Sequence, residues 1–223
     1  RMEMDTTFFL FLIAGFLAQM IDGCIGMAYG VSSTSLLLSF GVPPAAASAS
    51  VHTAEVFTTF VSGISHYKLK NIDKKLFSSL VVPGVIGGVL GAFILTNIDT
   101  TIIKPIINVY LIAMGIRIIY KALAKSTDKT VQIIKDIRLY ILGIIGGFLD
   151  AIGGGGWGPV VTTTLVADGN TPRFVIGSVN ASEFFVTVAQ AITFVTLIGL
   201  GEYWKIILGL AAGGVLAAPF AAF

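Results

Sequence analysis

The chain has 223 residues, of which 55% are apolar and 12% are charged, and its mean hydropathy is +0.92. A soluble domain carries about 25% charged residues, so this composition excludes a soluble globular protein and indicates a polytopic protein in contact with membrane lipid. The formal net charge of +2 gives no reason to expect a nucleic-acid partner, and the single Cys24 excludes an internal disulfide and a cysteine-based zinc site.

Apolar segments follow one another closely along the chain. We expect nine of them, at residues 7–21, 31–41, 44–66, 76–97, 101–123, 138–152, 157–168, 173–200 and 205–223. Residues 76–98 alone are 23 positions without a charge, enough to cross the ~30 Å hydrocarbon layer at ~1.5 Å per residue.

Two pairs of segments are joined by glycine-rich breaks, DGCIGMAYG at residues 22–30 and GGGGWGP at residues 153–159. No member of either pair is long enough to span comfortably alone, and consecutive glycines interrupt a helix. We therefore expect each pair to form two half-helices, either re-entrant or broken within one crossing. The irregular backbone between them must be covered by protein or line a wet cavity.

The chain also matches itself at a constant offset of 128 residues. Residues 15–59 align without a gap to residues 143–187, with 13 identities in 45 positions. This pattern predicts an all-α membrane fold of two homologous repeats, residues 1–125 and 137–223, joined by a cytoplasmic linker at residues 126–136. The second repeat has no counterpart of segment 101–123, so we expect it to lack its last helix.

Basic residues gather in two stretches, one from Lys68 to Lys75 and one from Arg117 to Arg138. Two spans separate them, so they lie on one side, which the positive-inside rule makes cytoplasmic. Residues 97–100 and the Pro43–Pro44 corner are then external. Re-entrant pairs would make the repeats inverted, and pairs that cross once would make them parallel. We favour inverted repeats, because half-helix tips that meet near the midplane are typical of transport sites.

Four of the 12 acids lie inside apolar segments, with no Lys or Arg closer than ten residues: Asp22, Glu55, Asp150 and Glu183. They form two repeat-related pairs, Asp22 with Asp150 and Glu55 with Glu183. A charge at the bilayer centre costs at least ~2.5–3.5 kcal/mol, so acids placed twice at equivalent positions predict coupling of transport to protons or other ions. The alternative is structural, with the aspartates capping half-helices and protonated glutamates linking helices.

His52 and Asn180 each precede one of these glutamates by three residues, so each pair shares a helix face. Both offer a hydrogen-bond donor to a substrate. The His-x-x-Glu spacing also suggests a metal, but the second copy has Asn, and one His/Glu pair is a poor ligand set. We expect neither a metal nor a cofactor.

The glycine breaks predict an anion site, because a half-helix that begins after a break presents free N–H groups and the positive end of its dipole. The expected substrate-binding residues are Gly26, Tyr29, Ser32, Ser33, Thr34, His52, Gly154, Gly155, Gly156, Trp157, Thr162, Thr163 and Asn180. The alternative is that the small residues allow close helix packing and that the two aromatic residues belong to the core. A G-x-G-x-x-G match at residues 153–158 has no preceding strand, so we expect no nucleotide.

Residues 147–159, GFLDAIGGGGWGP, a following proline corner and residues 177–184, GSVNASEF, together resemble the TauE/SafE sulfite exporter-like permeases, also called the toluene sulfonate uptake permease (TSUP) family. The resemblance covers essentially the whole chain. It implies a secondary carrier for sulfite, sulfoacetate or another organosulfonate in the plasma membrane of a bacterium or archaeon. The first break has fewer glycines than the second, so the two half-sites are expected to be unequal.

We therefore expect a transporter of small anions, coupled to protons or other ions, and not an enzyme. An anion channel of the same architecture is the alternative, and a membrane enzyme or cofactor-binding subunit is a weaker one. The sequence leaves the oligomeric state, the direction of transport and the substrate open.

Overall fold

The computed structural model describes residues 2–123 and 136–221, and within these ranges the chain is helical with no strand. The helices are α1 (Met2–Ile25), α2 (Tyr29–Ser39), α3 (Pro44–Lys68), α4 (Lys74–Asn97), α5 (Thr100–Leu123), α6 (Asp136–Gly153), α7 (Thr163–Ala167), α8 (Pro172–Ile198) and α9 (Trp204–Ala221). A π-helical turn, Gly158–Thr162, leads into α7, and a 3-10 turn, Gly201–Tyr203, leads into α9.

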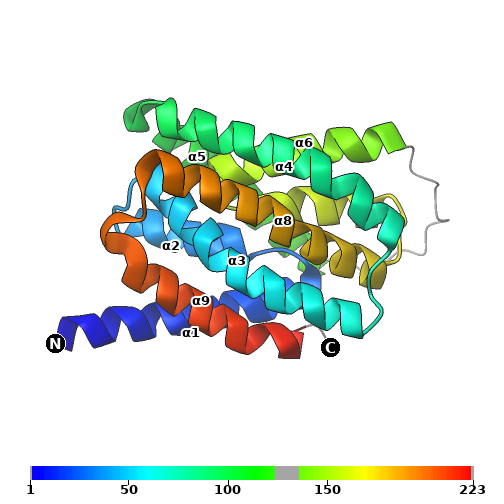
Figure 1. Ribbon diagram of the computed structural model, residues 1–223, viewed down its shortest axis with the longest axis horizontal. Helices are drawn as coiled ribbons and strands as arrows, with labels where there is room; N and C mark the ends of the chain where they lie inside the picture. Colours follow the sequence, from blue (N-terminus) through cyan, green and yellow to red (C-terminus); the bar gives the residue numbers. More distant parts are fainter. Residues whose placement is uncertain (1, 124–135, 222–223) are drawn as a thin grey trace.

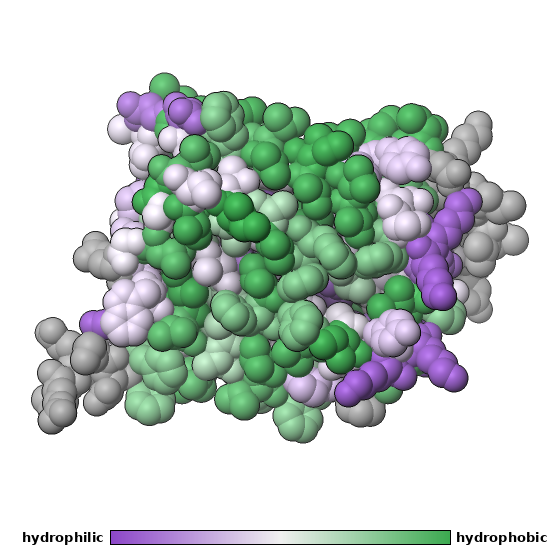
Figure 2. Space-filling view, in the orientation of Figure 1, coloured by the Kyte–Doolittle hydropathy of each residue, from purple (hydrophilic) through white to green (hydrophobic). Residues whose placement is uncertain are grey.

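Five of the described segments are long and apolar enough to cross a membrane: Thr6–Ile25, Lys74–Asn97, Thr100–Tyr120, Pro172–Ile198 and Trp204–Ala221. Apolar side chains cover the middle of the face in Figure 2, and hydrophilic side chains gather at the two ends of the molecule. The all-α polytopic class is confirmed.

The first apolar segment is longer than expected. Segment 7–21 was predicted to be too short to span, but α1 has 24 residues and continues through Asp22 and Cys24. The helix continues because the Gly26 amide donates to the Asp22 carbonyl, 2.5 Å away, so residues assigned to the break complete its last turn. The chain leaves the helix at Gly26, whose φ of 70° suits glycine.

Two hairpins enter the molecule from opposite ends (Figure 1). Helix α1 starts at the end that also holds the α4–α5 and α8–α9 connections, and α2 returns to that end. Helix α6 starts at the other end, near the α3–α4 connection, and α7 returns there. Helices α3 and α8, which pack against each other, run in opposite directions. These directions support the interpretation of the halves as inverted repeats, which stays a proposal.

Glycines bring the paired helices close together. Helix α1 lies along α9, and α6 lies along α4. A side chain on Gly15 would collide with the backbone of Leu210, and one on Gly147 would collide with the backbone of Gly84. Close packing of small residues therefore accounts for glycines outside the breaks.

Candidate functional site

Each glycine break is bridged by an aspartate from the last part of the preceding helix. Asp150 Oδ1 accepts hydrogen bonds from the amides of Gly156 and Trp157, at 2.8 and 3.0 Å. Asp22 Oδ1 accepts a longer bond, 3.4 Å, from the amide of Tyr29 at the start of α2. The aspartates thus cap the half-helices that follow them, as the structural alternative expected.

The backbone of both breaks adopts conformations that favour glycine. Gly154 and Gly155 have φ values of 65° and 156° in the second break. In the first break Gly26 has a positive φ, and so does Ala28, at 123°. A non-glycine residue in this region is strained, and such strain often occurs at functional sites.

His52, Glu55 and Asp150 form a first half-site. His52 Nδ1 lies 2.8 Å from Glu55 Oε2 and 3.9 Å from Asp150 Oδ2. His52 Nε2 faces the carbonyl oxygen of Asp150 at 3.2 Å. Gln190 of α8 donates to Asp150 Oδ2 at 2.9 Å. Because a carbonyl only accepts, Nε2 carries a hydrogen, and one further proton is shared between His52 Nδ1 and Glu55.

Asn180, Glu183 and Asp22 form a second half-site. In the amide orientation that satisfies both carboxylates, the Asn180 nitrogen donates to Glu183 Oε2 at 3.3 Å and to Asp22 Oδ2 at 3.2 Å. The amide oxygen then faces His66 Nε2, 3.5 Å away. This half-site has an amide where the first has an imidazole, so the two are chemically unequal.

The two half-sites correspond residue by residue at the offset of 128. Each combines a polar residue and a glutamate from one half of the chain with an aspartate from the other half. The breaks are linked in the same reciprocal way, because Thr34 donates to the Gly154 carbonyl and Thr162 donates to the Gly26 carbonyl. The halves therefore interlock at their glycine breaks.

A direct contact between equivalent residues lies beside this cluster. The hydroxyls of Thr59 and Thr187, which are 128 positions apart, lie 3.4 Å from each other. If an axis relates the two halves, equivalent residues can meet only near it, so this contact is what the inverted-repeat interpretation expects where α3 and α8 cross.

Four carboxyl groups are gathered in this buried region. Asp22, Glu55, Asp150 and Glu183 are 1–7% exposed, and each lies within electrostatic range of the other three. His52 is the one basic side chain bonded to them among the described residues. Ionising four buried carboxylates together beside one imidazole is costly, so this arrangement favours protonation of some of them.

The hydroxyls expected to bind an anion mostly bond to the backbone. Thr34 and Thr162 donate to the breaks, and Thr163 donates to the Pro159 carbonyl while it accepts from Arg117 Nε at 2.7 Å. Ser32 is exposed, on the outside of α2. Ser33 Oγ is buried and has no hydrogen-bond partner.

Tyr29 and Trp157, the two aromatic residues in the breaks, are held by hydrogen bonds. Tyr29 Oη donates to the Leu210 carbonyl at 2.9 Å, and Trp157 Nε1 donates to the Val179 carbonyl at 3.1 Å. Both side chains are at most 2% exposed. They anchor each break to the neighbouring helices, which favours the core-packing alternative over contact with a substrate.

The structure adds residues that the sequence did not single out. Gln190 contacts Asp150, His66 faces Asn180, and Tyr110 Oη donates to the Gly155 carbonyl at 3.0 Å. Gln190 lies three residues beyond the aligned block, so a longer alignment at the same offset would have included it. His66 and Tyr110 come from positions with no polar counterpart in the repeat, so nothing in the sequence marked them.

The candidate site consists of carboxyl, imidazole and amide groups, which can carry protons and exchange hydrogen bonds. Among residues 2–123 and 136–221, no group of three or more His, Cys, Asp or Glu side chains has the arrangement of a metal site.

Comparison with known proteins identifies a family. A family model described as "Sulfite exporter TauE/SafE" matches residues 11–223. The chain is 46% identical over 220 residues to a protein of Bacillus subtilis (strain 168) named "Probable membrane transporter protein YtnM", covering 96% of this chain and 73% of that protein. No solved structure matches the chain.

Proposed function

The chain belongs to the TauE/SafE sulfite exporter family, and from this premise we propose that it moves sulfite or an organosulfonate such as sulfoacetate, with coupling to protons. Family membership and the relative identify a multi-pass membrane transporter of the plasma membrane. The anionic substrate, the coupling and the residues that carry them are the proposal.

The interlocked half-sites carry this proposal. An oxygen of the Asp150 carboxylate accepts hydrogen bonds from the amides of Gly156 and Trp157, at the start of the second half-helix. A sulfonate or sulfite oxygen has similar charge and size, so it can bind the same amides when Asp150 releases them. A protonated carboxyl is a weaker acceptor, so a proton on Asp150 favours that release.

This competition links proton and anion occupancy. An anion that enters beside ionised Asp22, Glu55, Asp150 and Glu183 is repelled, and it is tolerated once the acids are protonated. Glu55 holds its proton with His52, whereas Glu183 is bonded to Asn180, which cannot titrate. We assign coupling to the four acids, and substrate contact to the breaks and to His52 and Asn180.

Transport in proteoliposomes tests the coupling. Wild-type protein should accumulate radiolabelled sulfite or sulfoacetate against its gradient when a pH gradient is imposed. Glu55→Gln and Glu183→Gln should each abolish the dependence of uptake on pH, because an amide cannot carry the proton. Asp99→Asn, at the exposed start of α5, is the matched control and should behave as wild type.

Unchanged pH-dependent uptake in both glutamine variants would refute the role of the glutamates in coupling. Flux that only equilibrates the anion, at electrophysiological rates and without accumulation, would instead identify an anion channel of the same architecture.

A further inference from the structure

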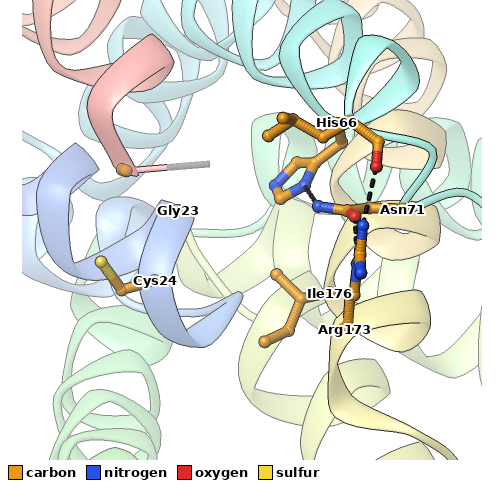
Figure 3. A pocket seen from close by; sticks show the side chains of 8 residues that line it. Gly23, Cys24, His66, Asn71, Arg173 and Ile176 are labelled. Carbon is orange, nitrogen blue, oxygen red and sulfur yellow. Dashed lines mark hydrogen bonds between the residues drawn. The ribbon is translucent and has the colours of Figure 1, made fainter. Parts of the chain in front are cut away.

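A cavity of about 620 Å³ opens beside the α3–α4 connection. This end of the molecule holds Lys68, Lys70, Lys74 and Lys75, and we call it the lysine-rich end. Figure 3 shows its walls, which include Gly23 and Cys24 of α1, His66 of α3, Asn71 of the connection, and Arg173 and Ile176 of α8. It therefore lies between the two halves of the chain. Neither glutamate and neither aspartate of the half-sites lines it.

Arg173 brings a fixed positive charge to the cavity wall. Its Nε donates to Asn71 Oδ1 at 2.5 Å, and its Nη2 donates to the Leu69 carbonyl at 2.9 Å. These two bonds use two of the five N–H groups of a guanidinium, which suits paired contacts with carboxylate or sulfonate oxygens.

A chain of hydrogen bonds leads from this arginine to the second half-site. Asn71 Nδ2 donates to His66 Nδ1 at 3.2 Å, so the proton of a neutral His66 ring lies on Nε2. Nε2 faces the Asn180 oxygen, whose amide nitrogen donates to Glu183 and Asp22. Every donor in this chain points from the cavity toward the acids.

The floor of the cavity also reaches the first glycine break. A Cβ on Gly26 would lie 3.1 Å from Ile176 Cγ1, so Ile176 of the cavity wall lies close to the residue that follows α1. At the first half-site, the residue that corresponds to His66 is apolar. Phe194, at the position that corresponds to His66, stacks on the His52 ring with centroids 6.1 Å apart and is 0% exposed.

We propose that this cavity is the entrance through which the transported anion reaches the second half-site from the lysine-rich end, with Arg173 as its first contact. The inference rests on the proposed function and specifies one route for it. The bonds through Asn71 and His66 connect occupancy of the cavity to Asn180.

Cys24 supplies a direct test, because it is the single cysteine of the chain and its exposed side chain lies on the cavity wall. The rate at which N-ethylmaleimide labels the purified protein should fall several-fold, and saturably, as sulfoacetate is added. Sulfoacetate is the probe because sulfite reacts with maleimides. Arg173→Gln should remove this protection, whereas Arg138→Gln should retain it, since Arg138 pairs with Asp168 at 3.0 Å and does not line the cavity.

Arg173→Gln removes bonds to Asn71 and Leu69 and can therefore disturb the α3–α4 connection. A second variant tests the cavity without removing them. Ile176→Trp leaves the hydrogen bonds of Arg173 in place and fills the cavity, so it should slow Cys24 labelling without ligand and lower sulfoacetate uptake several-fold. Equal protection of wild type and Arg173→Gln, or normal uptake by Ile176→Trp, would overturn the entrance.

Uptake of sulfoacetate by the same preparations distinguishes failure of the proposed entrance from failure of the proposed function. Uptake without protection of Cys24 rejects the entrance and leaves the proposed function intact. Absence of both uptake and protection rejects the entrance together with an organosulfonate substrate.

Discussion

Asp150 and Asp22 occupy equivalent positions but make unequal bonds. Asp150 accepts from two backbone amides and from Gln190, all within 3.0 Å. Asp22 accepts a 3.4 Å bond from Tyr29 and one from Asn180. The second glycine break therefore depends more on its aspartate than the first does.

Asp150→Ala should lower the free energy of unfolding more than Asp22→Ala. Each buried donor left without an acceptor costs about 1–3 kcal/mol. Asp150→Ala leaves the amides of Gly156 and Trp157 without one, whereas Gln190 keeps its bond to the Gly147 carbonyl. Chemical or thermal unfolding in detergent measures the difference. An equal decrease in the free energy of unfolding in the two variants would show that the difference in bonding does not affect stability.

The sequence identified most of the polar residues of the site but not their pairing. The repeat singled out the four acids, His52 and Asn180. It could not show that the aspartate of one half joins the glutamate of the other, because His52 and Asp150 are 98 positions apart and only the fold brings them together. His66 and Arg173 have no polar counterpart in the repeat, so they were found only in three dimensions.

At the level of elements, helix α2 packs directly on the second glycine break. A Cβ on Gly155 would collide with the backbone of Gly30 and Val31, and the φ of Gly155 is 156°. No side chain can be accommodated there without moving α2 away from the break.

Gly155→Ala should therefore destabilise the protein by at least about 1–3 kcal/mol from backbone strain alone, and it should reduce transport. Gly115→Ala in α5 is the matched control, since a Cβ there meets nothing within 4 Å and alanine favours a helix by up to about 1 kcal/mol. Unfolding curves of the two variants in detergent should move in opposite directions. Similar curves would contradict the close contact between α2 and the break.

Apolar segments in the sequence predicted the helices to within a few residues, because a lipid-facing helix needs a continuous apolar run. Two local features were not predicted from the sequence. Helix α1 extends to Ile25, through residues whose glycine and acid suggested a loop. The turn Gly158–Thr162 is π-helical, and no composition distinguishes a π-turn from the start of an α-helix.

For the whole molecule, the distribution of lysines predicts orientation. The connection between α3 and α4 and the connection between α4 and α5 lie at opposite ends (Figure 1). In a Cys24→Ser background, a membrane-impermeant maleimide added to intact cells should label Thr100→Cys and not Lys74→Cys, because the lysine-rich end is proposed to be cytoplasmic. Both positions are exposed. The opposite labelling would reverse the orientation and place the cavity outside.

The reciprocal bonds at the breaks have a consequence for biosynthesis. The Gly26 carbonyl receives its partner, Thr162, from a position 136 residues later in the chain. At a synthesis rate of about 5–20 residues per second, the first hairpin waits on the order of ten seconds for that hydroxyl. Until then the Gly26 carbonyl lacks this partner. We therefore expect the nascent first half to bind a membrane insertase or chaperone, which covers the tip until the second hairpin has been synthesised.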